Sequence, residues 1–252
     1  MNSSAAAFLR SLALAICFAT AAHAADKPVR VALYDDAGAF GQGVPRITEQ
    51  LGKVKDVKLT IVKGPEIASG VLKDFDVVIF SGGSGSKQAA GIGDKGREEV
   101  QKFVKSGGGY VGICGGAYLA CGGFSWGLGI LNAKTVSSKW QRGKAQVQIE
   151  VNAEGQRTTG IPAQQQEIRY ANGPIIKPAD LPGLPPYETL AFFRSEVAEH
   201  DSPVGAMVNS PAWVRADCGK GRVLISSPHP EQTDGMESWI EHAVRWVAAG
   251  QR

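Results

Sequence analysis

The sequence lacks the features of a nucleic-acid-binding, multiply membrane-spanning or repetitive protein. Its 27 Lys and Arg nearly balance 24 Asp and Glu, giving a formal net charge of +3, and the cations form no basic stripe. After the N-terminal apolar stretch no second long hydrophobic run follows. Internal repeats and low-complexity tracts are also missing. We therefore predict a globular protein with no nucleic-acid partner.

The N-terminal stretch predicts export. Arg10 is an early positive charge, an apolar run covers 12–22, and the small-residue segment Ala-His-Ala ends at Ala24. This order is typical of a secretory signal peptide that is cleaved before Ala25. We therefore expect the working protein in the periplasm or outside the cell.

Two other interpretations of the N-terminus fit less well. A retained membrane anchor is disfavoured because the apolar run is short for a bilayer. A lipoprotein signal at Cys17 is disfavoured because a bulky residue precedes it. Removing the signal peptide, 1–24, leaves 228 of the 252 residues, and we expect these, 25–252, to form one domain without a membrane span.

The sequence has little cysteine, which limits its disulfides. Without the signal peptide, three remain, at Cys114, Cys121 and Cys218, so at least one thiol is unpaired within a single chain. If one helix carried Cys114 and Cys121, their separation of roughly 10 Å would exclude a bridge. A Cys121–Cys218 bridge stays open, beside the alternative that all three are small buried residues.

The first half of the chain alternates apolar runs with helical patterns. Strands are expected in "VRVALYDD" from Val29, "VKLTIV" from Val57, "DVVIFSGG" from Asp76 and "YVGIC" from Tyr110. Helices are expected in "PRITEQLGK" and "GDKGREEVQKFVKSGGG". This alternation predicts an α/β fold with a mostly parallel sheet and helices on both faces.

The second half of the chain has a different pattern. "KAQVQIEVN" alternates apolar and polar residues, which favours an antiparallel strand, and further strands are expected within 168–178, 188–196 and 205–226. "MESWIEHAVRWVAAG" predicts a C-terminal helix. The simplest assembly is therefore an α/β domain with an antiparallel edge.

One cysteine stands where the backbone has to bend sharply. Cys114 ends an apolar run and is followed at once by Gly115 and Gly116, with Gly112 two residues before it. This spacing matches a nucleophile elbow, in which a strand turns into a helix and exposes the reactive side chain. The helix N-terminus favours a thiolate. The alternative is a tight turn that merely buries a cysteine.

A cysteine nucleophile needs a base. Of the histidines after the signal peptide, His200 lies in a polar loop and His242 in the C-terminal helix. His229 instead follows an apolar strand and precedes Pro230 and Glu231. In an extended segment, residues two apart point the same way, so Glu231 can orient the imidazole. We predict a catalytic triad of Cys114, His229 and Glu231.

An oxyanion hole would need two N–H donors. Gly115 supplies one with the elbow, and Gly83 in "SGGSGS" supplies a candidate second at the end of a neighbouring strand. The alternative for "SGGSGS" is a flexible loop or a phosphate cradle, but the lysine of a P-loop is missing. We predict neither a metal ion nor a cofactor.

Taken in order, "SGG", "GICGG" and "SSPHPE" resemble the class I glutamine amidotransferase-like superfamily. "GYVGICGGAYLA", "RYANGP" and "GKGRVLISSPHPE" are similar to the family found at the amino end of biotin–protein ligases and in free-standing proteins. The resemblance implies a flavodoxin-like open sheet, the triad Cys114, His229 and Glu231, and an oxyanion hole at Gly83 and Gly115. Biotin ligation is not implied, since that active site belongs to a different domain.

The sequence departs from glutamine-using members of the superfamily at one position. They typically carry Gln four residues after the cysteine, where this chain has Tyr118. We also expect no synthetase domain that would receive ammonia. Both departures count against glutamine as the substrate.

We therefore predict an exported cysteine-dependent hydrolase or acyl-transfer enzyme that acts on a small-molecule or peptide amide. Tyr118, Tyr170, Asn172 and the loop 35–43, including Asp35, are candidate substrate contacts, with ordinary packing as the alternative. A non-catalytic binding module and a redox or thiol-protective protein remain alternative functions. The substrate and the oligomeric state stay open.

Overall fold

The computed structural model describes residues 27–251, so the predicted signal peptide lies outside the described residues. Within that range a nine-stranded sheet runs through the molecule in the order β2-β1-β3-β4-β11-β10-β9-β6-β7. The first five of these strands are parallel. Counted along the chain their order is 2-1-3-4-5, the flavodoxin-like arrangement. They are β1 (Val29–Tyr34), β2 (Val57–Val62), β3 (Val77–Phe80), β4 (Gly109–Ile113) and β11 (Gly221–Ser226).

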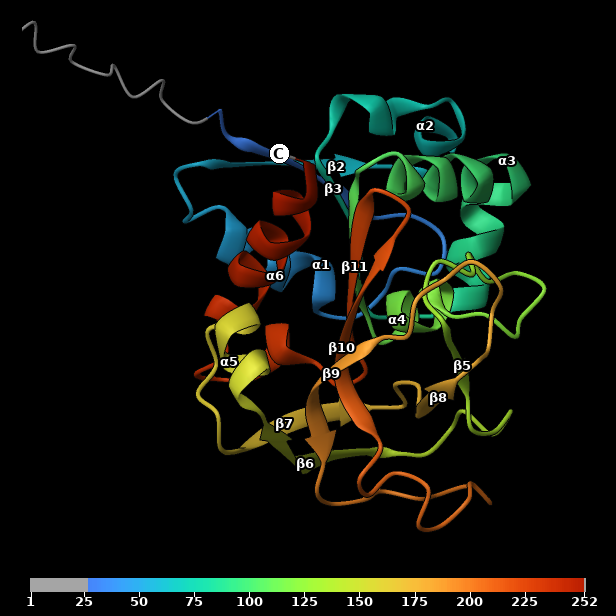
Figure 1. The fold of residues 1–252 in the computed structure, drawn as a ribbon, viewed down its shortest axis with the longest axis vertical. Helices are drawn as coiled ribbons and strands as arrows, with labels where there is room; N and C mark the ends of the chain where they lie inside the picture. Colours follow the sequence, from blue (N-terminus) through green and yellow to red (C-terminus); the bar gives the residue numbers. More distant parts are fainter. Residues whose placement is uncertain (1–26, 252) are drawn as a thin grey trace, which may run out of the picture.

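Four antiparallel strands extend the sheet beyond β11 and end at β7, an edge strand (Figure 1). A separate small sheet pairs β5 (Ala133–Thr135) with β8 (Ile176–Pro178). The predicted α/β fold, with a parallel core and an antiparallel edge, is confirmed. The antiparallel strands are β6 (Lys144–Val151), β7 (Gln165–Ala171), β9 (Glu188–Phe193) and β10 (Pro211–Cys218).

The helices cover both faces of the parallel strands. Successive strand residues point to opposite sides, so Leu33 and Ile79 pack in one core while Tyr34 and Phe80 pack in the other. The first core also holds α1 and α6, and the second holds α2, α3 and α4. The helices are α1 (Gly43–Leu51), α2 (Gly64–Ala68), α3 (Gly85–Lys105), α4 (Gly115–Ala120), α5 (Ala153–Thr159) and α6 (Ser238–Ala248). Short 3₁₀ turns cover Val71–Asp74, Pro230–Gln232 and Ala249–Gln251.

Some elements differ from the sequence-based expectation. α3 begins at Gly85, inside the expected "SGGSGS" loop, and bends at Gly93, where φ is 65°. The residues 205–209 form turns rather than a strand, with positive φ at Gly205 and Asn209. α5 was not expected; it is capped by Asn152, whose Oδ1 accepts the Gly155 N–H at 2.7 Å.

All three described cysteines, Cys114, Cys121 and Cys218, are free and buried. The structure therefore contains no Cys121–Cys218 bridge among the described residues, which matches the alternative of small buried thiols. Burial raises the pKa of the Cys121 thiol to about 12, so this side chain stays neutral.

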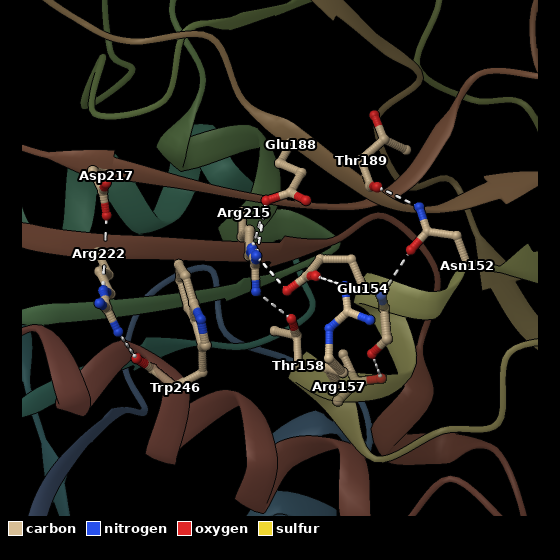
Figure 2. A network of polar contacts seen from close by, with 12 residues as sticks. Asn152, Glu154, Arg157, Thr158, Glu188, Thr189, Arg215, Asp217, Arg222 and Trp246 are labelled. Carbon is tan, nitrogen blue, oxygen red and sulfur yellow. Dashed lines mark hydrogen bonds and ion pairs between the residues drawn. The ribbon is translucent and has the colours of Figure 1, made fainter.

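A cluster of arginines and one tryptophan fastens α5 and α6 to the antiparallel strands (Figure 2). Arg215 on β10 forms ion pairs with Glu154 of α5 and Glu188 of β9. The Trp246 ring of α6 lies between two guanidinium groups, with its centroid 5.0 Å from Cζ of Arg215 and 4.9 Å from Cζ of Arg222. The antiparallel extension is thereby tied to the helical layer that covers the parallel strands.

We expect Trp246→Leu to lower the free energy of unfolding by about 1–2 kcal/mol, since two cation–π contacts of about 0.5–1 kcal/mol each are lost. Trp140→Leu is the matched control, because the Trp140 side chain is 54% exposed and packs little. Urea denaturation followed by circular dichroism measures both variants. Equal midpoints for the two variants would contradict the stabilising role of Trp246.

Candidate active site

Cys114 lies in a strained turn between β4 and α4. Its φ of 51° and ψ of −99° are rare for any residue other than glycine, a kind of strain that clusters at functional sites. Its backbone N–H donates to the Ser226 carbonyl at 2.9 Å, and its thiol donates to the Ala171 carbonyl at 3.4 Å. The side chain is only 5% exposed, yet it lines a cavity. The local geometry is that of a nucleophile elbow.

The glycines around Cys114 are required by space. A Cβ on Gly116 would lie 2.0 Å from the Phe80 carbonyl oxygen, and one on Gly112 would lie 2.6 Å from the Gly116 oxygen. A Cβ on Gly115 would lie 2.9 Å from the backbone of Gly83. Any larger residue would therefore push the elbow away from the end of β3.

His229 and Glu231 lie side by side and are both buried. The imidazole Nδ1 is 2.8 Å from Glu231 Oε1, and Gln232 Nε2 donates to the same oxygen at 2.8 Å. The extended segment expected here is instead a 3₁₀ turn, Pro230–Gln232. The turn still brings the carboxylate to Nδ1, which leaves Nε2 of the imidazole for a proton exchange elsewhere.

The environment of His229 favours its charged form. Burial by itself lowers the pKa of this imidazole, but the charges of Glu231 and Cys114, with hydrogen bonds to both side chains, raise the pKa to about 10. Glu231 is 1% exposed, and its Oε2 has no hydrogen-bond partner among the described residues. A buried carboxylate of this kind needs a nearby cation, which the imidazolium supplies.

The two predicted oxyanion donors are neighbours in space. The backbones of Gly83 and Gly115 are in direct contact, although 31 residues lie between them in the sequence. Among the described residues neither N–H is bonded to a backbone acceptor. Gly82 is also constrained, since a Cβ there would lie 2.8 Å from His229 Cε1. The arrangement combines a thiol, a base and free N–H donors.

A cavity of about 550 Å³ opens over these groups, which suits a small ligand. Of the predicted substrate contacts, Tyr118 and Asn172 line it, and the Tyr118 hydroxyl donates to the Asn172 carbonyl at 3.1 Å. Its lining residues are Phe40, Gly41, Gln42, Gly83, Ser84, Gly85, Ser86, Cys114, Tyr118, Phe124, Trp126, Ser137, Ser138, Trp140, Lys144, Arg169, Ala171, Asn172, His229 and Gln232.

The structure does not bring the other two predicted contacts to the cavity wall. Tyr170 is fully buried, with its ring edge-on to Phe193 and its hydroxyl donating to the Gly173 carbonyl at 2.7 Å. Asp35 lies at the end of β1, and its carboxylate is 3.7 Å from Lys63 Nζ. The loop 35–43 contributes Phe40, Gly41 and Gln42 instead.

Several lining residues were missed by sequence reasoning. The rings of Phe124 and Trp126 stack with centroids 4.4 Å apart, and Lys144 and Arg169 add two cations. Gln232 directly follows the "HPE" motif, so its adjacency was a usable signal. Phe124 and Trp126 lie two residues apart in the loop that follows α4, and this loop carries no comparable signal in the sequence.

Residues 27–251 contain no cluster of three or more His, Cys, Asp or Glu suited to a metal ion. In the same range, every helix is too short or too polar to cross a bilayer.

Residues 30–139 match the family described as "Biotin-protein ligase, N terminal". This part of the chain is therefore similar to that family, in agreement with the resemblance found in the sequence. The match includes Gly83, Cys114 and Gly115 and ends before His229 and Glu231. No curated protein sequence matches the chain.

Solved structures share the fold. A glutamine amidotransferase is 21% identical with a TM-score of 0.57, over 87% of this chain and 98% of its own. PurLQS from Thermotoga maritima is 18% identical with a TM-score of 0.56, over 88% and 98%. A ThuA-like protein from Parabacteroides merdae is 14% identical with a TM-score of 0.57, over 89% and 91%. The chain thus has a glutamine amidotransferase-like fold.

The raised pKa of His229 predicts a pH-dependent stability. Because the folded value, about 10, exceeds the value of about 6.5 expected when unfolded, protonation stabilises the fold fully below pH 6.5. This contribution is lost as the pH rises from about 6.5 to about 10. We expect the unfolding free energy of the native protein to fall over this range more steeply than that of His229→Gln.

The control is His200→Gln, since the His200 side chain is 66% exposed. It should keep the slope of the native protein in urea denaturation at each pH. Parallel slopes for the native protein and His229→Gln would show that His229 does not titrate as described.

Proposed function

We propose that this chain is an exported cysteine-dependent hydrolase or acyl-transfer enzyme that acts on an amide. The observation that carries the proposal is the strained Cys114 turn beside His229, whose charged form is favoured by Glu231. An imidazolium next to a thiol stabilises the thiolate, which is the nucleophilic form. The signal-like N-terminus supports action outside the cytoplasm.

The proposed reaction proceeds in two halves. Cys114 Sγ attacks the acyl carbon, and the N–H groups of Gly83 and Gly115 stabilise the oxyanion. As the C–N bond breaks, His229 gives its proton to the leaving amine. Water or another acceptor then attacks the thioester, His229 takes its proton, and the thiolate leaves. Glu231 holds the imidazole in place throughout.

The same site argues against glutamine as the substrate. Tyr118 occupies the position where glutamine-using enzymes of this fold typically carry Gln, and its ring lines the cavity. Burial raises the pKa of Tyr118 well above its usual value, so the phenol stays neutral and serves as a donor to Asn172. The substrate pocket therefore differs chemically from a glutamine pocket.

The first test is alkylation of Cys114 by iodoacetamide across a range of pH, followed by peptide mass spectrometry. We expect Cys114 to react faster at neutral pH in the native protein than in His229→Ala, because a neighbouring imidazolium favours the nucleophilic form of a thiol. His229→Ala should move the profile toward that of an ordinary thiol. A profile of ordinary shape that His229→Ala leaves unchanged would overturn the proposed activation.

A second test addresses acyl transfer itself. With p-nitrophenyl acetate we expect a burst of p-nitrophenolate and an acetyl adduct on Cys114, because the thioester forms before it is hydrolysed. Cys114→Ala should abolish both signals. Cys218→Ala is the matched control, since Cys218 lies buried at the end of β10. Retention of the burst in Cys114→Ala would exclude Cys114 as the acylated group.

A further inference from the structure

Arg169 differs from every other arginine within residues 27–251. The nine others each form an ion pair with a carboxylate, while Arg169 has no acidic partner in that range. Its side chain lines the cavity over Cys114. A guanidinium is always charged and presents a planar fork that matches a carboxylate. The unpaired arginine is therefore placed where a ligand can reach it.

Lys144 adds a second cation on the same side of the hairpin. In the β6–β7 register Lys144 lies opposite Ala171, and Arg169 is two residues from Ala171 on the same face. The Ala171 carbonyl accepts the thiol of Cys114, and the Arg169 carbonyl accepts the His229 N–H at 2.8 Å. No Asp or Glu is among the lining residues. The cavity thus has a cationic wall beside the proposed base.

An aromatic wall adjoins the oxyanion donors instead. A Cβ on Gly85 would meet the Gly115 oxygen at 2.7 Å and the Trp126 ring at 3.2 Å, so Trp126 lies close to the elbow. Phe40, whose backbone N would lie 3.1 Å from a Cβ on Gly83, also lines the cavity while 62% exposed, although such a large apolar side chain gains from burial. A ring-bearing or apolar group bound there would cover them.

We propose that the substrate is an N-acyl amino acid with a free carboxylate and a ring-bearing acyl group. This inference rests on the proposed function, because it assumes that the amide lies between Cys114 and His229. The acyl group packs on the aromatic wall beside the oxyanion donors. The carboxylate, on the leaving-amine side, pairs with Arg169 and Lys144 beside His229.

The reaction balances without a further reactant. Cys114 Sγ forms a thioester with the acyl carbon, the C–N bond breaks, and the amino acid leaves with the proton from His229. Water then cleaves the thioester, which releases the carboxylate of the acyl group and restores Cys114. One amide and one water become one carboxylate and one amino acid.

The experiment separates binding from turnover. Cys114→Ala, which cannot form a thioester, is titrated calorimetrically with N-phenylacetyl-L-alanine and with its carboxamide. We expect the carboxylate to bind at least about tenfold tighter, because it can accept charge-assisted hydrogen bonds from the guanidinium. Adding Arg169→Gln should remove this preference. Adding Arg46→Gln, which alters an exposed arginine paired with Glu49 on α1, should keep it.

The native protein is then given the same two probes, and release of the amine is measured. Carboxylate-selective binding that depends on Arg169, together with release of the amine, supports the inference. The same binding without release of the amine supports the recognition of the carboxylate and overturns both its role as a substrate group and the proposed function. Equal binding of both probes, or no binding of either, overturns the inference. Hydrolysis without preference for the carboxylate also overturns it, and the proposed function then stands.

Discussion

Contact between two stretches of backbone, at the ends of β3 and β4, is the constraint on which the site depends. Gly116 lies against the Phe80 carbonyl and Gly115 against Gly83, with no room for a Cβ at either glycine. The Gly116 N–H donates to the Ser81 carbonyl at 3.2 Å, and the Tyr110 hydroxyl binds the Gly116 carbonyl at 2.7 Å. These bonds offset the cost of the unusual backbone at Cys114.

The sheet order also determines where the charged side chains of the site lie. Because β11 lies next to β4 in the parallel sheet, the segment after β11 reaches the elbow and delivers His229 and Glu231. Both are buried, so each requires the other's charge, and the Gln232 amide holds the carboxylate from a further side. The glutamine amidotransferase-like sheet order thus brings Cys114 together with His229 and Glu231, which lie more than 100 residues further along the chain.

Contiguous apolar runs predicted the parallel strands, and the spacing of glycines around Cys114 predicted the elbow. The sequence does not predict the start of α3, because glycine and serine disfavour a helix. In the structure α3 begins at Gly85, which packs against Gly115. Arg169 and Tyr170 show a second feature that the sequence does not predict, namely which side chains of a strand face the cavity. They are adjacent on β7 and point to opposite faces, and a strand's sequence alone does not say which face borders a cavity. The sequence analysis predicts Tyr170 as a substrate contact, whereas in the structure Tyr170 is buried and Arg169 lines the cavity.

β7 is hydrogen-bonded to a single neighbouring strand, β6, and lies at the far end of the sheet from β2. The parallel strands that carry Cys114 and precede His229 share no ladder with it. β7 contacts Cys114 and His229 through its backbone carbonyls, and substitutions of its outward side chains keep these carbonyls in the chain. In evolutionary terms, mutation can explore ligand preference on this hairpin at little risk to folding, so homologues with the same elbow are free to diverge in what they recognise.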